Sequence, residues 1–248
     1  MFDYSEAADD FFVNLNLQTT LALPNSREGI LHFFEAVQRD FRAMASFYQR
    51  ETGEYVLESN RQDGSYSWLE LETNHMTAGF FNPPSLEEAY RLHRWLLDRS
   101  VYFLGISGLD VECLDILFGF NLDYDGNRDA IVAEALLGDS PLAALVGEDT
   151  AQCVECEPSL IIAIDEECYM QARISVETHS SSFQVRAGQY DDEPISIYFT
   201  IRRYPTSGKI INMTESLARQ CKACEDLTQR IVIPQVVRPV ALAIATAQ

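Results

Sequence analysis

The chain has 248 residues, of which 47% are hydrophobic, enough to bury the core of a folded globular protein. Its 38 Asp and Glu against 18 Lys and Arg give a formal net charge of −20 at pH 7. A field of this sign repels nucleic acid, anionic lipid and phosphorylated ligands, so we expect neither a nucleic-acid nor a membrane partner.

The acidity is concentrated in the first half of the chain, residues 1–150. This half holds 26 Asp and Glu against nine Arg and no Lys, a balance of −17. The second half, residues 151–248, holds 12 acids against nine basic residues, a balance of −3. Such a field attracts cations and basic protein surfaces. The sequence therefore predicts a basic protein surface as the partner, and the alternative is that the acidity only keeps the protein soluble.

The first half alternates between strand patterns and amphipathic helix patterns. Alternation from Val13 to Leu23 predicts a strand, and a cap at 25–26 starts a helix whose apolar stripe runs from Ile30 to Phe41. The other elements expected here are strands at 45–50, 54–59, 65–73, 76–81 and 101–106, a helix from Ser85, a strand-like segment from Leu114 to Tyr124, and a helix from Arg128 to Leu137.

The second half is predicted to be a four-stranded antiparallel meander covered by a helix. Its strands are expected at 159–164, 168–178, 183–189 and 195–204, and its helix from Thr214 to Arg230. Turn residues and acids cluster at 138–158, where we place the domain boundary. The predicted fold class is α+β, built from two antiparallel-sheet-plus-helix units: an acidic α+β domain at 1–150 and a β-meander plus C-terminal helix domain at 151–248.

The order of elements in the first half, together with its acidity, resembles the arrangement of secretion-chaperone-type folds, although no motif accompanies this likeness. The N-terminus lacks the basic start and apolar run of a secretory signal. The most apolar stretch, Ile231 to Ala247, is interrupted by Pro234, Arg238 and Pro239. Six cysteines are few for a chain this long, so reduced thiols and a cytoplasmic location are expected.

One segment has the spacing of a calcium loop. Counting Asp123 as position 1, oxygen ligands fall at positions 1, 3, 5 and 12, which are Asp123, Asp125, Asn127 and Glu134. Position 6, where glycine normally allows a sharp turn, is Arg128, which also brings a positive charge toward the ion. The competing interpretation is an Asp-Gly turn followed by Asn127 as the cap of a helix.

Four cysteines form two CxxC pairs that could hold zinc. The pairs are Cys153 with Cys156 and Cys221 with Cys224, and together they could close a tetrahedral Cys₄ site. Glutamate follows the second cysteine of each pair, where zinc knuckles usually have glycine, and the second pair continues the apolar stripe of the last helix. Buried thiols that pack as small hydrophobic residues are the preferred interpretation.

No motif for catalysis or for a cofactor stands out. The chain lacks GxGxxG, Walker A, HExxH and GxSxG patterns, and its four histidines have no context that would mark a catalytic base. We expect no cofactor. The sequence favours a non-catalytic protein-binding protein, an adaptor or chaperone-like protein, that binds its partner through the acidic N-terminal surface and forms a homodimer. The alternative is a metal-dependent protein or enzyme with its site at the 123–134 carboxylates or at the four cysteines.

Overall fold

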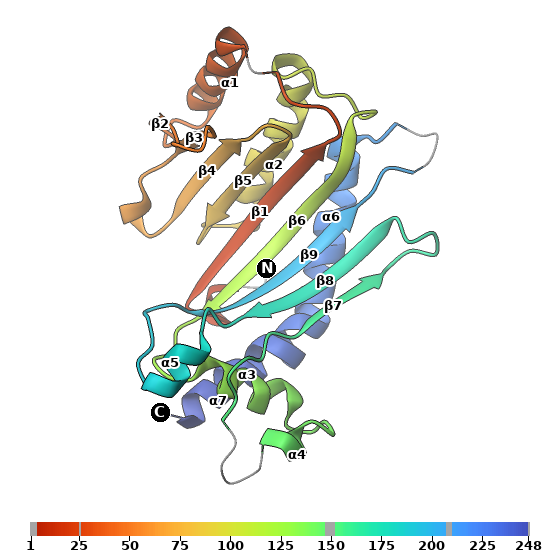
Figure 1. Ribbon diagram of the computed structural model, residues 1–248. Helices are drawn as coiled ribbons and strands as arrows, with labels where there is room; N and C mark the ends of the chain where they lie inside the picture. Colours follow the sequence, from red (N-terminus) through yellow and green to blue (C-terminus); the bar gives the residue numbers. More distant parts are fainter. Residues whose placement is uncertain (1–3, 25, 147–151, 207–209, 248) are drawn as a thin grey trace.

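A single antiparallel sheet organises the molecule. The computed structural model describes residues 4–24, 26–146, 152–206 and 210–247. Within them nine strands form one sheet in the order β2-β3-β4-β5-β1-β6-β9-β8-β7, with antiparallel neighbours throughout, and helices cover one of its faces (Figure 1). The predicted α+β class with an antiparallel sheet is therefore confirmed. The proposed boundary between 150 and 151 lies outside the described residues.

The strands are β1 (Asp10–Thr19), β2 (Ser46–Gln49), β3 (Tyr55–Glu58), β4 (Tyr66–Leu71), β5 (His75–Phe81), β6 (Val111–Leu122), β7 (Ser159–Ala163), β8 (Met170–Glu177) and β9 (Ile195–Arg203). The helices are η1 (Tyr4–Glu6), α1 (Arg27–Asp40), η2 (Arg61–Asp63), α2 (Leu86–Phe103), α3 (Arg128–Leu137), α4 (Ala143–Val146), α5 (Ser182–Ala187), α6 (Met213–Leu227), η3 (Thr228–Val237) and α7 (Arg238–Ala247).

The two halves of the chain share the sheet instead of building one each. Strand β6 of the first half pairs with β9 of the second over nine residues, for example Phe118 with Phe199. Both strands bury alternate apolar side chains in the same cluster, so one core serves both halves. The expectation of two separate sheet-and-helix units is corrected in this respect.

Two predicted strands are helical. The segment 183–189 contains α5, because Ser181 and Gln184 form a capping box that starts a helix. The second half therefore contributes three strands, not a four-stranded meander. The segment expected as a strand at 101–106 contains the end of α2, whose first turn is capped by Ser85 and which runs on to Phe103.

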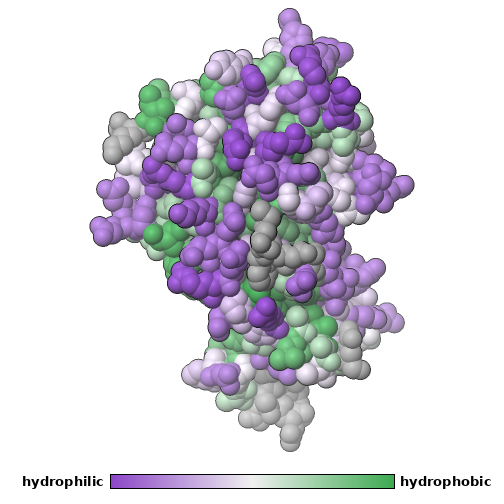
Figure 2. Space-filling view, turned by 180° about the vertical axis from the view of Figure 1, so that it is seen from behind, coloured by the Kyte–Doolittle hydropathy of each residue, from purple (hydrophilic) through white to green (hydrophobic). Residues whose placement is uncertain are grey.

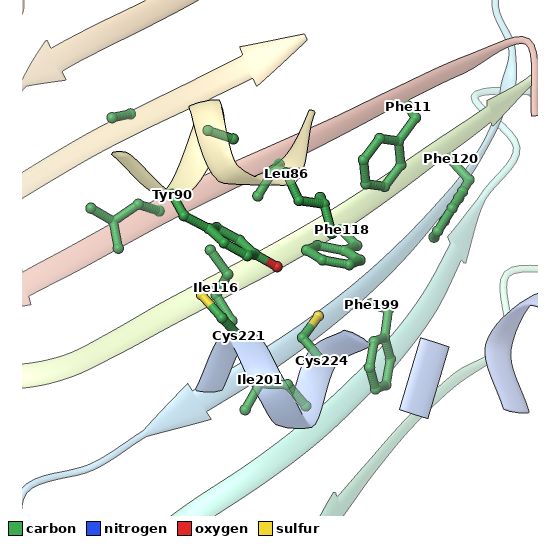
Figure 3. Packing of buried hydrophobic residues seen from close by; sticks show 14 of the residues in the cluster. Phe11, Leu86, Tyr90, Ile116, Phe118, Phe120, Phe199, Ile201, Cys221 and Cys224 are labelled. Carbon is green, nitrogen blue, oxygen red and sulfur yellow. The ribbon is translucent and has the colours of Figure 1, made fainter. Parts of the chain in front are cut away.

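The helix-covered face of the sheet holds the core. Leu15 and Leu17 of β1 and Phe118 of β6 are fully buried there, and α6 packs directly against β6 and β9. Figure 3 shows the thiols of Cys221 and Cys224 pointing from α6 into this apolar cluster. Burial of such side chains contributes roughly 1.5–3 kcal/mol each, so this face supplies most of the stability.

The C-terminal helices form one long run, Met213–Ala247. Its middle part, η3, has π-helical hydrogen bonding around Pro234, which cannot donate a backbone N–H to a regular α-helix. The run has the length and hydropathy of a membrane-spanning helix, with a mean hydropathy of 1.4 over 18 residues, of which 33% are buried in the molecule. Core helices pass the same test, so the cytoplasmic location stays a prediction. Seen from the helical side, hydrophilic residues cover most of the upper surface and hydrophobic ones gather toward the lower end (Figure 2).

Candidate functional site

An acidic hollow lies at one end of the two central strands β6 and β9. Because Leu122 pairs with Ile195, the loop that leaves β6 and the loop that enters β9 lie side by side. Together they surround a hollow of about 440 Å³. Its lining residues are Asp123, Tyr124, Asp125, Tyr190, Asp191, Asp192 and Glu193. None of them is basic: five are acidic and two are tyrosines, and one of the acids, Asp191, accepts a hydrogen bond from Gln184 Nε2 at 2.7 Å.

A buried arginine holds the second of these loops in place. The Arg128 side chain is fully buried, and its Nη1 donates to the backbone carbonyls of Asp191 (2.8 Å) and Glu193 (2.7 Å). Its Nε donates to Ser180 Oγ at 3.2 Å, and its guanidinium lies 6.0 Å from the centre of the Tyr190 ring. The Arg128 guanidinium therefore donates its hydrogen bonds to the backbone of the loop that enters β9 and not to the acidic side chains of the hollow.

Repulsion between carboxylates is visible at Asp123. Partial burial raises the pKa of this carboxyl, and the nearby charges of Asp9, Asp10 and Asp192 raise it further. The backbone N–H of Asp123 donates to the Asp9 carboxylate at 2.8 Å, which brings the N-terminal acids to the same end of the sheet. A positively charged group placed in the hollow would relieve this repulsion.

The turn at Asp125 and Gly126 shapes the hollow. A Cβ atom at position 126 would lie 2.7 Å from a ring carbon of Tyr124, so glycine lets this ring lie against the backbone. Asn127 then caps α3, as its Oδ1 accepts from the N–H of Ala130 at 3.1 Å. The segment therefore forms an Asp-Gly turn followed by a helix cap, the alternative to a calcium loop.

The open face of the sheet, opposite the helices, carries a row of polar side chains across five strands. In register they are Thr77 of β5, Asn16 of β1, Asp115 of β6, Arg202 of β9 and Gln171 of β8. Asp115 is 4% exposed and accepts two hydrogen bonds from Arg202, at 2.8 and 2.6 Å, which raise the pKa of the guanidinium. The row forms part of the lining of a hollow of about 470 Å³.

A row of aromatic side chains runs beside the polar row. Tyr66 stacks on Phe81, Phe81 on Phe12, and Phe12 meets Tyr198 edge to face, with ring centres 5.1 to 6.1 Å apart. The Phe12 ring covers Gly119, where any Cβ atom would collide with it. The open face is thus an ordered surface and not merely a solvated one.

The calcium candidates separate in the structure. Asp123 and Asp125 line the acidic hollow, whereas Asn127 caps α3 and its Nδ2 donates to the carbonyl of Cys153 at 2.9 Å. Glu134 is an exposed residue of α3. Within the described ranges, no group of three or more His, Cys, Asp or Glu side chains could hold a metal ion.

The zinc candidates form two pairs with different surroundings. Cys221 and Cys224 belong to α6 and point into the core (Figure 3). Burial raises the pKa of the Cys221 thiol to about 12 and the pKa of the Cys224 thiol well above the ordinary value for cysteine. Burial also raises the pKa of Cys156 to about 11, while Cys153 is half-buried. Neutral thiols of this kind pack as small apolar groups, the preferred interpretation of the sequence.

The comparisons with known proteins leave the function open. No protein-family model matches the chain, and no curated protein matches it. Among solved structures, one match is the rolling circle replication initiator protein from Geobacillus stearothermophilus, with a TM-score of 0.24 and 7% identity over 88% of this chain and 78% of that one. A TM-score this low carries no argument about fold or function.

Sequence reasoning missed half of the acidic hollow. It singled out Asp123 and Asp125, but Tyr190 and the acids from Asp191 to Glu193 lie about 65 residues further along the chain. The local signal was the run of three consecutive acids just before a predicted strand. Only the register between β6 and β9 brings the two loops together.

Proposed function

We propose that this protein is a non-catalytic protein-binding protein, an adaptor or chaperone-like partner, that recognises a basic surface through its acidic one. The observation that carries the proposal is the acidic hollow of about 440 Å³, which has five acidic residues and no basic one in its lining. The surrounding first half carries a balance of −17, so attraction of a basic partner begins at long range.

The hollow fits the side chain of an arginine or lysine of the partner. Carboxylates at its rim form charge-assisted hydrogen bonds with such a group, and the Tyr124 and Tyr190 rings add cation–π attraction. Five acidic residues spread over two loops suit a broad basic surface better than a single bound cation.

Capture of partners from lysate of the source cells tests the proposal. Three substitutions, Asp123→Asn, Asp125→Asn and Asp192→Asn, remove charge from the hollow and keep the side-chain shape. We expect the wild type to retain a basic partner at low salt and to lose it at high salt, because exposed charges are screened over about 8 Å at physiological ionic strength. The triple variant should not retain the partner at either salt concentration.

A matched control removes the same charge elsewhere. Glu28→Gln, Glu35→Gln and Glu87→Gln lie at exposed positions of α1 and α2, and this variant should still retain the partner. The proposal fails if no partner is retained at low salt, if the partner is acidic and insensitive to salt, or if both triple variants behave alike.

A further inference from the structure

Strand β7 forms an edge of the sheet and is exposed along its whole length. All five of its residues are exposed, and its three large apolar side chains, Leu160, Ile161 and Ile162, keep 49–59% of their surface in solvent. Figure 1 shows α6 behind β6 and β9, with β7 at the outer margin of the sheet. Both faces of this strand are therefore available to a partner.

The backbone of β7 offers a regular set of free hydrogen-bonding groups. Its bonds to β8 include Val176 N–H to the carbonyl of Pro158 and Ile164 N–H to that of Met170. Because bonded pairs alternate along an antiparallel ladder, the even-numbered residues face β8, and Ser159, Ile161 and Ala163 direct their N–H and C=O groups outward. In the described part of the chain no strand pairs with these groups.

The opposite edge strand, β2, is protected where β7 is not. β2 has four residues, and its Phe47 ring packs against Phe34 of α1, with ring centres 5.0 Å apart, and against Tyr55 of β3. β7 contains no charged residue, proline or bulge, the devices that normally prevent an edge from pairing with another chain. An edge left open in this way is suited to strand addition.

Charge decides between the possible occupants of this edge. Exposed acids flank β7 on both sides, with Glu155 and Glu157 before it and Glu166 and Glu167 after it. A second copy paired antiparallel about Ile161 would bring the acids before β7 of each copy, Glu155 and Glu157, toward those after β7 of the other, Glu166 and Glu167. Like charges directly opposite each other are destabilising, so self-pairing is disfavoured.

We propose that β7 binds an extended segment of another protein, apolar in its centre and with Lys or Arg at both ends, which adds to the sheet as a tenth strand. The backbone groups of Ser159, Ile161 and Ala163 supply the hydrogen bonds. The side chains of Leu160, Ile161 and Ile162 contact the apolar centre, and the flanking glutamates pair with the basic ends. This edge is separate from the acidic hollow and does not depend on the function proposed for it.

A labelled synthetic peptide tests strand addition directly. The probe is Lys-Lys-Val-Thr-Val-Thr-Val-Lys-Lys with blocked ends. The control peptide replaces the central Thr-Val-Thr with three prolines, which keeps the charge and removes N–H donors from both edges of the peptide. Fluorescence anisotropy of the full chain should show saturable binding of the probe and none of the control. Equal binding of the two peptides, or no saturable binding, overturns the proposal.

Substitutions on β7 locate the binding. Ile161→Pro removes an outward N–H without breaking a bond to β8 and should weaken binding at least tenfold, about the effect of one net hydrogen bond. Ile161→Val keeps the N–H and the branched Cβ and should bind within about threefold of the wild type, because only one methylene group of a partly exposed side chain is lost. If Ile161→Pro does not fold, as judged by circular dichroism, Ala163→Pro makes the same change at the next outward position.

Two further measurements distinguish peptide binding at β7 from binding in the hollow and from pairing of two copies. Glu166→Lys with Glu167→Lys should weaken binding, whereas the hollow variant with Asp123→Asn and Asp192→Asn should bind the probe as the wild type does. Loss of binding in the hollow variant would place the peptide in the hollow and overturn the proposal. A dimer in ultracentrifugation that Ile161→Pro converts to a monomer would assign the edge to a second copy instead.

Discussion

The two faces of the sheet differ in how their side chains are held. On the covered face, alternate residues of β1 such as Val13, Leu15 and Leu17 are fully buried among apolar neighbours. On the open face, the intervening Asn14, Asn16 and Gln18 are half-buried. Because apolar burial dominates folding free energy, stability resides on the covered face, and the open face is free to carry polar chemistry.

The largest difference between the faces is expected from truncating one phenylalanine on each. Phe118→Ala on the covered face should lower the free energy of unfolding by about 3–5 kcal/mol, because it leaves a cavity in the core. Phe12→Ala on the open face removes a half-buried ring and should cost about 1–2 kcal/mol. Urea titration of both variants checks this, and equal losses would contradict the contrast between the faces.

A pH effect should come from His93 of α2. It is fully buried, both ring nitrogens lack a hydrogen-bond partner among the described residues, and burial lowers its pKa to about 3. In the unfolded chain the imidazole binds a proton below its ordinary pKa of about 6.5, whereas in the folded protein it stays neutral down to about pH 3. The free energy of unfolding is therefore unaffected by this group above pH 6.5 and decreases as the pH falls toward 3, by a few kcal/mol in all.

Replacement of the histidine separates its contribution from that of other groups. His93→Leu should reduce the dependence of the free energy of unfolding on pH between about pH 6.5 and 3, because one of the groups that titrates there is removed. His32→Gln, at an exposed position of α1, is the control and should leave it unchanged. A slope in His93→Leu equal to that of the wild type would assign the effect to other groups.

A smaller effect is expected from the ion pair of the open face. Arg202→Met leaves the Asp115 carboxylate, 4% exposed, without its partner and should cost about 1–3 kcal/mol. The Arg202 side chain is 39% exposed, so solvent screening moves the value toward the lower end. Adding Asp115→Leu should recover most of the loss in a double-mutant cycle, and strict additivity would show that the two residues do not interact.

The smallest effect is expected from removal of metal. Chelator should leave the melting temperature unchanged, because the raised pKa of Cys221 and Cys224 keeps both thiols neutral within the covered face. Elemental analysis of the purified protein is the companion measurement. Stoichiometric zinc, or a melting temperature that falls when chelator is added, would support the alternative of a metal-dependent protein.

Local signals in the sequence located most elements but not their assembly. The helices starting after Ser26 and Ser85 and the alternating strand β8 follow from caps and periodicity, which act over a few residues. The segment 183–189 was misassigned because its short apolar pattern suits either state, and the cap at Ser181 decides for a helix.

The candidate site was predictable only in part. Asp123 and Asp125 were recognisable as an oxygen-rich turn, but the role of Arg128 was not, since its hydrogen-bond acceptors are carbonyls more than 50 residues away. The exposed edge at β7 could not be predicted either, because the pattern that predicts a strand does not indicate whether that strand lies at the edge or in the middle of a sheet. Long-range register determines both features.

The pairing of β6 with β9 also constrains how the chain can fold during synthesis. The central strands β1, β6 and β9 are separated by about 100 and 80 residues, and contacts between such distant segments form slowly. Until residues 195–203 emerge, β6 presents an unpaired edge with its core side chains exposed, which invites aggregation. A fragment of residues 1–150 produced alone should therefore accumulate in inclusion bodies. Co-expression with a fragment of residues 151–248 should return the first fragment to the soluble fraction.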